Sequence, residues 1–225
     1  MQYWTILFLF TACLSRLSFA ADSLKEVAET EWELKRDRDG IQIYTAEITG
    51  SAHNAVRAET IVEGVRLSAL VAVIEDAEAC AEWADRCAES YIVERPSTTE
   101  AIIYTHNDLP FPVSDRDVTA RATWSQNPQT LEVMLESMAI SCVMDEVRGR
   151  VRLTEATVYW QFVPLGENRV QIINRAHINP GSALPGWVTN MLLVDTPFET
   201  LEGMVDFVKR PEYRDAEIEF VTEPE

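Results

Sequence analysis

Apolar and polar residues alternate with a period of two along much of the chain, which is the pattern of half-buried β-strands. The pattern is clearest at residues 55–63, where Val56, Ala58 and Val62 share one parity and charged residues take the other. Further strands are predicted at residues 41–48, 91–95, 101–106, 118–124, 131–138, 151–163 and 170–178. Short connections between such runs are typical of antiparallel meanders. The pattern predicts a large antiparallel sheet with one wet face.

The long run at residues 151–163 changes parity part-way along. Val151 and Leu153 share one parity, whereas Ala156 and the apolar residues after it share the other. Because a strand turns successive side chains to opposite faces, a bulge or break is predicted near Thr154.

Two segments switch to the three-and-four spacing of an amphipathic helix. Residues 66–79 form the first, and residues 185–209 form a second and longer one near the C-terminus. Pro197 lies inside the second and should kink it, because a mid-helix proline lacks the N–H donor and clashes with the preceding turn. Residues 22–30 are expected to form a further short helix.

Length and charge restrict the class of protein. The chain has 225 residues, of which 47% are hydrophobic and 25% charged, as in a globular protein with one main core. The formal net charge of -18 would repel nucleic acid and the anionic leaflet of a membrane. Residues 211–225 are acidic and lightly apolar, and are expected to form a mobile tail.

The N-terminus reads as a secretory signal peptide at residues 1–20. Residues 4–14 are almost wholly apolar, and Ser18 and Ala20 place small side chains where signal peptidase reads them. Cleavage after Ala20 predicts a periplasmic or secreted protein. An uncleaved membrane anchor, or lipid attached at Cys13, is the alternative.

Removal of the signal leaves Cys80, Cys87 and Cys142, an odd number that does not indicate a disulfide framework. On an unbroken helix the backbones of Cys80 and Cys87 would lie roughly 10 Å apart, beyond the reach of about 7 Å for a disulfide. We therefore favour two buried thiols flanking Trp83. A bridge requires a helix break between them.

Three short motifs carry a family resemblance. They are Glu82-Trp83, Leu109-Pro110-Phe111-Pro112-Val113-Ser114-Asp115-Arg116-Asp117, and Asn179-Pro180-Gly181-Ser182-Ala183-Leu184-Pro185-Gly186-Trp187-Val188-Thr189-Asn190. In this order, and with this succession of elements, residues 23–210 resemble the START (steroidogenic acute regulatory protein-related lipid transfer) domain. Family members usually carry Asp-Pro-Gly-Gly where this chain has Asn179 to Ser182.

The resemblance implies an α+β helix-grip fold, in which a curved antiparallel sheet wraps a long C-terminal helix and encloses an apolar tunnel. The domain would occupy residues 21–210. It also implies one bound lipid or other hydrophobic small molecule, a monomer, and a gate at the tunnel mouth. The gate would be formed by the start of the last helix and by Leu109, Pro110, Phe111 and Pro112.

Several side chains are candidates for contact with the lipid. The apolar or helical ones, which could equally be plain core residues, are Trp160, Phe162, Trp187, Asn190, Met191 and Val194. Asn174 lies among apolar neighbours on its strand and could bond a ligand hydroxyl, or could be satisfied by the backbone. Arg121 resembles a family position that meets the lipid head, but its strand parity favours the wetter face.

Catalytic, metal and cofactor chemistry are not indicated. His53, His106 and His177 lie apart without a second ligand at metal spacing, and no nucleophile elbow or phosphate-binding glycine loop occurs. Two alternatives stay open. One is a cyclase or aromatase-like enzyme on the same fold, with Arg121, His106 and Asp117 as candidates. The other is a protein-binding module that uses the acidic surface. Transient membrane contact is compatible with the lipid-binding reading.

Overall fold

The computed structural model describes Leu24 and residues 31–225. The signal peptide expected at residues 1–20 and the short helix expected at residues 22–30 lie outside the described residues, apart from Leu24. Among the helices within the described range, none is long and apolar enough to cross a membrane.

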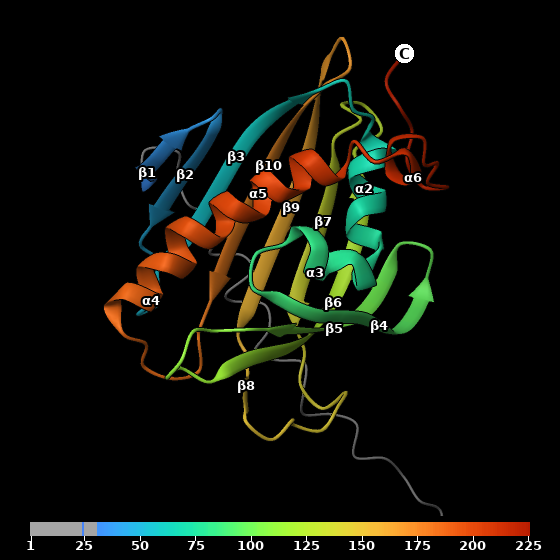
Figure 1. Cartoon of the computed structure of the whole chain (residues 1–225). Helices are drawn as coiled ribbons and strands as arrows, with labels where there is room; N and C mark the ends of the chain where they lie inside the picture. Colours follow the sequence, from blue (N-terminus) through green and yellow to red (C-terminus); the bar gives the residue numbers. More distant parts are fainter. Residues whose placement is uncertain (1–23, 25–30) are drawn as a thin grey trace, which may run out of the picture.

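The described residues form one curved ten-stranded sheet (Figure 1). Nine strands follow the order β1-β2-β3-β10-β9-β7-β6-β5-β4 with antiparallel neighbours, and β8 pairs in parallel with β6. The strands are β1 Glu33–Arg38, β2 Ile41–Ala46, β3 Ala55–Glu63, β4 Cys87–Ser97, β5 Glu100–Asn107, β6 Asp115–Gln126, β7 Val133–Ala139, β8 Arg150–Arg152, β9 Ala156–Gly166 and β10 Arg169–Ile178.

Each strand predicted from alternation is present, with shifted ends. The predicted break near Thr154 is confirmed, because β8 ends at Arg152 and β9 begins at Ala156. Strand β1 has the sequence ELKRDR, which has no apolar alternation, and all but one of its residues are exposed. It pairs with β2 through the backbone.

Helices cover one face of the sheet, which we call the inner face (Figure 1). The first group is α2 Leu67–Glu75, the 3-10 turn Ala77–Ala79 and α3 Cys80–Trp83. The second runs diagonally across the sheet as α4 Gly186–Asn190, the π-helical turn η3 Met191–Asp195 and α5 Thr196–Phe207, followed by α6 Pro211–Arg214.

The interruption predicted at Pro197 takes the form of a π-helical turn directly before α5, with Pro197 in the first turn of that helix. Proline has no N–H to donate to the carbonyl four residues earlier, so the regular hydrogen-bond ladder cannot continue through it. The wider π turn accommodates the missing hydrogen bond, and the helix continues as α5.

The main core lies between the inner face and the helices. Phe162 of β9 and Phe198, Leu201 and Met204 of α5 are all fully buried there. Helix α5 also passes close to the end of α3, because a Cβ added at Gly203 would overlap the carbonyl oxygen of Trp83. Burial of these side chains explains why α5 is held against the sheet.

The reading of Cys80 and Cys87 as free thiols is wrong, because the two residues form a disulfide with a Cα–Cα distance of 6.0 Å. The prediction assumed an unbroken helix. Instead α3 ends at Trp83, and Ala84 has an extended backbone with φ -91° and ψ 122°. The chain then turns back so that Cys87 starts β4.

The prediction of a detached tail at residues 211–225 is not borne out by the packing. Tyr213 is buried, and Ile218, Phe220 and Val221 pack against the main core. Glu223 accepts hydrogen bonds from the backbone N–H groups of Leu67 and Ser68, at 3.0 and 2.8 Å. The segment therefore covers the core and caps α2.

Candidate functional site: a cavity between sheet and helix

A cavity of about 680 Å³ lies between the inner face of the sheet and the α4–α5 helix. A volume of this order is typical of sites for small ligands. Its wall comes from β3, β6, β10, the loop after β10 and the helix, and its apolar part includes Val56, Leu109, Leu153, Ala176, Leu192 and Leu193. Gly181, Ser182 and Ala183 also line it and are exposed, so the cavity reaches the surface at this loop.

Arg116 places a charged side chain in the cavity wall, and this residue is only 4% exposed to solvent. Its Nε donates to the carbonyl of Pro180 at 3.3 Å, one terminal nitrogen donates to the carbonyl of Ser114, and the other donates to Ser182 Oγ at 2.9 Å. All three acceptors are neutral. Burial lowers the pKa of the Arg116 guanidinium from its ordinary value, although the charge of Asp115 acts in the opposite direction.

The loop that holds Arg116 is the one where this chain departs from the family pattern. Asn179 Oδ1 accepts the N–H of Gly181 at 3.0 Å, so asparagine closes the turn as aspartate would. Gly181 has φ 76°, a left-handed conformation that glycine adopts without strain. Ser182, in place of the usual glycine, supplies a hydroxyl to Arg116.

One residue of the predicted gate loop, Leu109, is buried and lines the cavity. Its N–H donates to Asp115 Oδ1 at 3.1 Å, and the N–H of Val113 donates to the carbonyl of Pro110 at 3.1 Å. Phe111 is 93% exposed, and Pro112 is exposed as well. The loop is thus anchored at both ends and presents an aromatic side chain to solvent between them.

The side chains of the C-terminal helix that line the cavity are not the ones that were predicted to line it. The predicted stripe was Trp187, Asn190, Met191 and Val194, whereas the lining residues are Thr189, Leu192, Leu193 and Thr196. Trp187 is 55% exposed. Asn190 is exposed too, and Val194 is buried outside the cavity lining. A regular helical period was assumed through a segment that contains a π turn, so the phase was wrong.

The other apolar candidates are core residues and do not line the cavity. Trp160 packs edge-on against Trp83 with ring centroids 6.2 Å apart, and Phe162 lies 6.3 Å from Trp124. Asn174 donates from Nδ2 to the carbonyl of Tyr159 at 3.2 Å, so the backbone satisfies its amide.

Arg121 does not line the cavity, and its direction is the one that strand parity favours rather than the one that the family resemblance implies. It is exposed and forms an ion pair with Glu100. The parity argument explains this position. Arg121 alternates with Ala122 and Trp124, which are buried in the core on the inner face, so its own side chain lies on the outer face.

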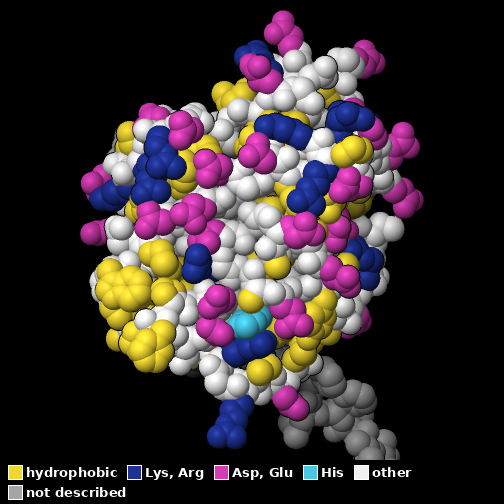
Figure 2. All heavy atoms as spheres, in the orientation of Figure 1, with side chains coloured by type: hydrophobic (Ala, Val, Ile, Leu, Met, Phe, Trp, Pro, Cys, Tyr) yellow, Lys and Arg dark blue, Asp and Glu magenta, His cyan; other side chains and the backbone are white. Residues whose placement is uncertain are grey.

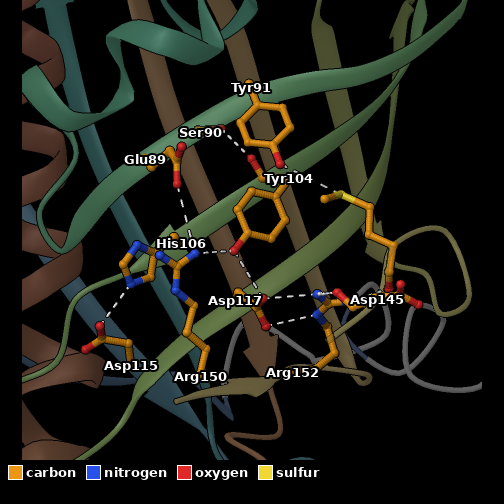
Figure 3. A network of polar contacts seen from close by, with 11 residues as sticks. Glu89, Ser90, Tyr91, Tyr104, His106, Asp115, Asp117, Asp145, Arg150 and Arg152 are labelled. Carbon is orange, nitrogen blue, oxygen red and sulfur yellow. Dashed lines mark hydrogen bonds and ion pairs between the residues drawn. The ribbon is translucent and has the colours of Figure 1, made fainter. Parts of the chain in front are cut away.

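The outer face carries a separate buried polar network (Figure 3). Asp117 and Tyr104 are almost fully buried, and Tyr104 Oη donates to Asp117 Oδ2 at 3.1 Å. Arg152 donates to both oxygens of Asp117, and Arg150 donates to Tyr104 Oη. Burial alone would raise the pKa of Asp117, but the hydrogen bonds and charge of Arg152 and the contact with Tyr104 hold it below its ordinary value.

His106 belongs to the same outer face, where its Nε2 lies 2.9 Å from Asp115 Oδ2. His177 lies 2.9 Å from Ser51 Oγ, and His53 lines the cavity. Within the described part of the chain, no three His, Cys, Asp or Glu side chains are grouped so as to hold a metal ion. His106, Asp117 and Arg121, the three residues weighed for catalysis, are therefore all on the side of the sheet away from the cavity.

Comparison with known protein families identifies the fold. A model of the START domain matches residues 19–214. This chain belongs to the START domain family. START domains generally bind lipids or other hydrophobic ligands, and the apolar cavity beneath the C-terminal helix has a volume typical of a small-ligand site.

Individual proteins agree with the family assignment. The chain is similar to a STAR-related lipid transfer protein of Xanthomonas axonopodis, with 28% identity and a TM-score of 0.73, covering 80% of this chain and 99% of the other. It is 24% identical to the phosphatidylcholine transfer protein of Bos taurus over 71% of this chain and 75% of that protein. The Zhui aromatase/cyclase of Streptomyces sp. R1128 shares the fold, with 14% identity, a TM-score of 0.50, and coverage of 69% and 93%.

Sequence reasoning missed Arg116 as a cavity residue. Its parity was available, because Arg116 lies an even number of positions from Ala122 and Trp124, which face the core. The same argument that placed Arg121 outside places Arg116 inside.

Proposed function

We propose that this START domain binds one lipid-like molecule in the cavity and carries or presents it without changing it chemically. The observation that supports this most is the apolar wall formed by residues such as Val56, Leu192 and Leu193. Removing a hydrocarbon chain from water contributes about 0.8 kcal/mol for each methylene buried. An apolar cavity is sufficient to bind such a chain without a catalytic group.

An enzyme of the cyclase or aromatase kind is the second candidate, favoured by the fold shared with the Streptomyces protein. Such chemistry needs an acid or base beside the substrate. The described residues that line the cavity include one histidine, His53, but no Asp or Glu that could act with it as an acid–base pair. This favours binding over catalysis, and unchanged ligand after long incubation would support the same conclusion.

We further propose that lipid enters and leaves at the loop of Leu109 and Phe111, in contact with a membrane. Phe111 and Trp187 are large apolar side chains left exposed, at 93% and 55%. Figure 2 shows acidic side chains spread over the visible face and an apolar patch at its lower left, where Figure 1 places α4. Aromatic side chains of this kind suit a membrane interface.

We propose that the protein acts outside the cytoplasm. Residues 1–20 read as a signal peptide, and the disulfide between Cys80 and Cys87 is of the kind that persists in an oxidising compartment. Sequencing the N-terminus of the exported protein should give Ala21 as the first residue. A retained Met1 or a lipid-modified Cys13 would contradict this.

Mass spectrometry of an organic extract from gently purified protein tests the binding proposal. We expect one amphiphilic molecule in near-equal amount to the protein. A fluorescent-lipid exchange assay between vesicles then tests entry at the loop. Phe111→Ser and Trp187→Ser should slow exchange several-fold, whereas the exposed Ile61→Ser on β3 should not. No extracted ligand and no exchange by the wild-type protein would refute the proposed function.

A further inference from the structure

The charge of the cavity is opposite to that of the chain. The protein carries a formal net charge of -18. Yet the cavity wall, as far as the described residues form it, includes Arg86 and Arg116 and no Asp or Glu. An acidic protein that keeps carboxylates out of this apolar cavity, and puts guanidinium groups there, creates a local environment that favours negative charge.

The two arginines differ in how far their charge is neutralised. Arg86 donates from Nε to Asp85 Oδ1 at 2.8 Å and forms an ion pair with it. Arg116 forms no ion pair in the described structure, and its neighbour Asp115 is engaged on the outer face with His106 and with the N–H of Leu109. Among the described residues, Arg116 is thus a buried charge without an ion-pair partner.

The donors of Arg116 are also only partly used. A guanidinium has five N–H groups. The hydrogen bonds to Pro180, Ser114 and Ser182 use one N–H group on each of the three nitrogens. One N–H remains on each terminal nitrogen, the pair that binds the two oxygens of a carboxylate or phosphate in a fork. Because a buried charge is costly without a partner, a ligand that supplies one gains affinity there.

We propose that Arg116 is the head-group site of the cavity and that the ligand is a single-chain amphiphile with an anionic oxygen head, either a carboxylate or a phosphate. The inference rests on the proposed lipid-binding function and narrows it. Ser182 and the carbonyl of Pro180 fix the guanidinium. The head lies near Ser182, where the cavity reaches the surface, and the chain extends inward along Val56, Ala176 and Leu193.

The volume of the cavity favours a ligand with one chain over a ligand with two. At roughly 30 Å³ per non-hydrogen atom, which is about the liquid volume of one water molecule, the cavity volume of about 680 Å³ holds about twenty such atoms. A long-chain fatty acid such as palmitate has this size. A two-chain phospholipid is more than twice as large. The phosphatidylcholine named for the bovine relative therefore differs from the proposed ligand in both size and charge.

Displacement of a fluorescent anthroyloxy fatty acid from the purified, delipidated protein tests the proposal. Four competitors separate the effect of head-group charge from the effect of ligand size. They are palmitate, hexadecanol with the same chain and no charge, lysophosphatidate with a phosphate head, and phosphatidylcholine in vesicles. We expect palmitate or lysophosphatidate, or both, to bind at least tenfold more tightly than hexadecanol. The stronger of the two identifies the head group.

Variants assign the charge effect to Arg116. Arg116→Met should reduce anion affinity at least tenfold and leave hexadecanol affinity within about twofold. Arg121→Met, the matched loss of an arginine on the outer face, should change neither. Ser182→Ala removes one contact to the guanidinium without a change in charge, and should weaken anion binding by a smaller factor while the protein stays folded.

The outcomes are distinct. If neither palmitate nor lysophosphatidate binds more tightly than hexadecanol, or if phosphatidylcholine is preferred, the anionic single-chain ligand is overturned while lipid binding stays intact. Failure of all four to bind would refute the proposed function itself. If Arg116→Met does not fold, the comparison of acid and alcohol on wild-type protein and on Ser182→Ala still decides the inference.

Discussion

Asp117 and Arg152 form a two-pronged ion pair on the outer face of the sheet, with Arg152 Nε 2.9 Å from Oδ1 and Nη2 3.0 Å from Oδ2 of Asp117. Arg152 also donates to the carbonyls of Met144 and Asp145, each at 3.1 Å. One side chain therefore fastens the loop between β7 and β8 to β6 (Figure 3). The pair stabilises the back of the sheet whose other side forms the cavity.

Arg152→Met should destabilise the protein by about 3–5 kcal/mol, because it leaves the carboxylate of Asp117 buried without its partner. Urea denaturation measures the change in the free energy of unfolding. Arg121→Met removes an exposed arginine from the same face and should have little effect, since surface ion pairs contribute little. Equal losses in the two variants would show that the Asp117 pair has no special role.

Stability should depend on pH through Asp117. Its folded-state pKa lies below the ordinary value of about 3.9, so the unfolded chain binds more protons between the two values. The stabilisation is complete above the ordinary value and is lost as pH falls through the folded-state pKa. The difference in unfolding free energy between wild type and Asp117→Asn should therefore shrink from pH 6 to pH 3. Asp206→Asn, an exposed control, should show no such convergence.

Glu223→Ala should lower the free energy of unfolding by about 1 kcal/mol, in the range of a lost helix cap. The carboxylate of Glu223 bonds the N–H groups of Leu67 and Ser68 at the start of α2, where Arg66 provides no side-chain cap. Glu219→Ala removes the same charge from an exposed position. If thermal unfolding shifts equally in both variants, the cap is not responsible.

Gly203→Ala should destabilise by roughly 1–3 kcal/mol, as expected for overpacking, although alanine is normally the better helix former. The added methyl would overlap the carbonyl oxygen of Trp83. Gly186→Ala in α4 meets no atom within 4 Å and should be neutral or stabilising. A Gly203→Ala variant as stable as wild type would mean that α5 can move away from α3 at no cost.

Much of the fold could be predicted from the sequence because its signals are local. Alternation located the strands, and even the parity change near Thr154 corresponded to a real break between β8 and β9. Strand β1 was not predicted, because an exposed edge strand held by backbone pairing needs no apolar side chains.

The candidate site was less predictable because it depends on long-range contacts. The disulfide between Cys80 and Cys87 required knowledge that α3 stops at Trp83. Alternation along β6 indicates that Arg116 points inward. Its contact with Ser182, which is 66 residues away in the sequence, cannot be read from that alternation. Neither relationship leaves a repeating pattern along the chain.

The π turn at Met191–Asp195 divides the C-terminal helix into two parts that can evolve separately. Before Pro197 the helix presents Thr189, Leu192 and Leu193 to the cavity. After Pro197 it presents Phe198 and Leu201 to the core. A π turn holds one residue more than a regular turn, and one residue corresponds to about 100° of helix rotation. Deleting that residue would turn a new set of side chains toward the cavity while α5 stayed packed against the core. A lineage could thus change its ligand by a single-codon deletion without rebuilding the fold.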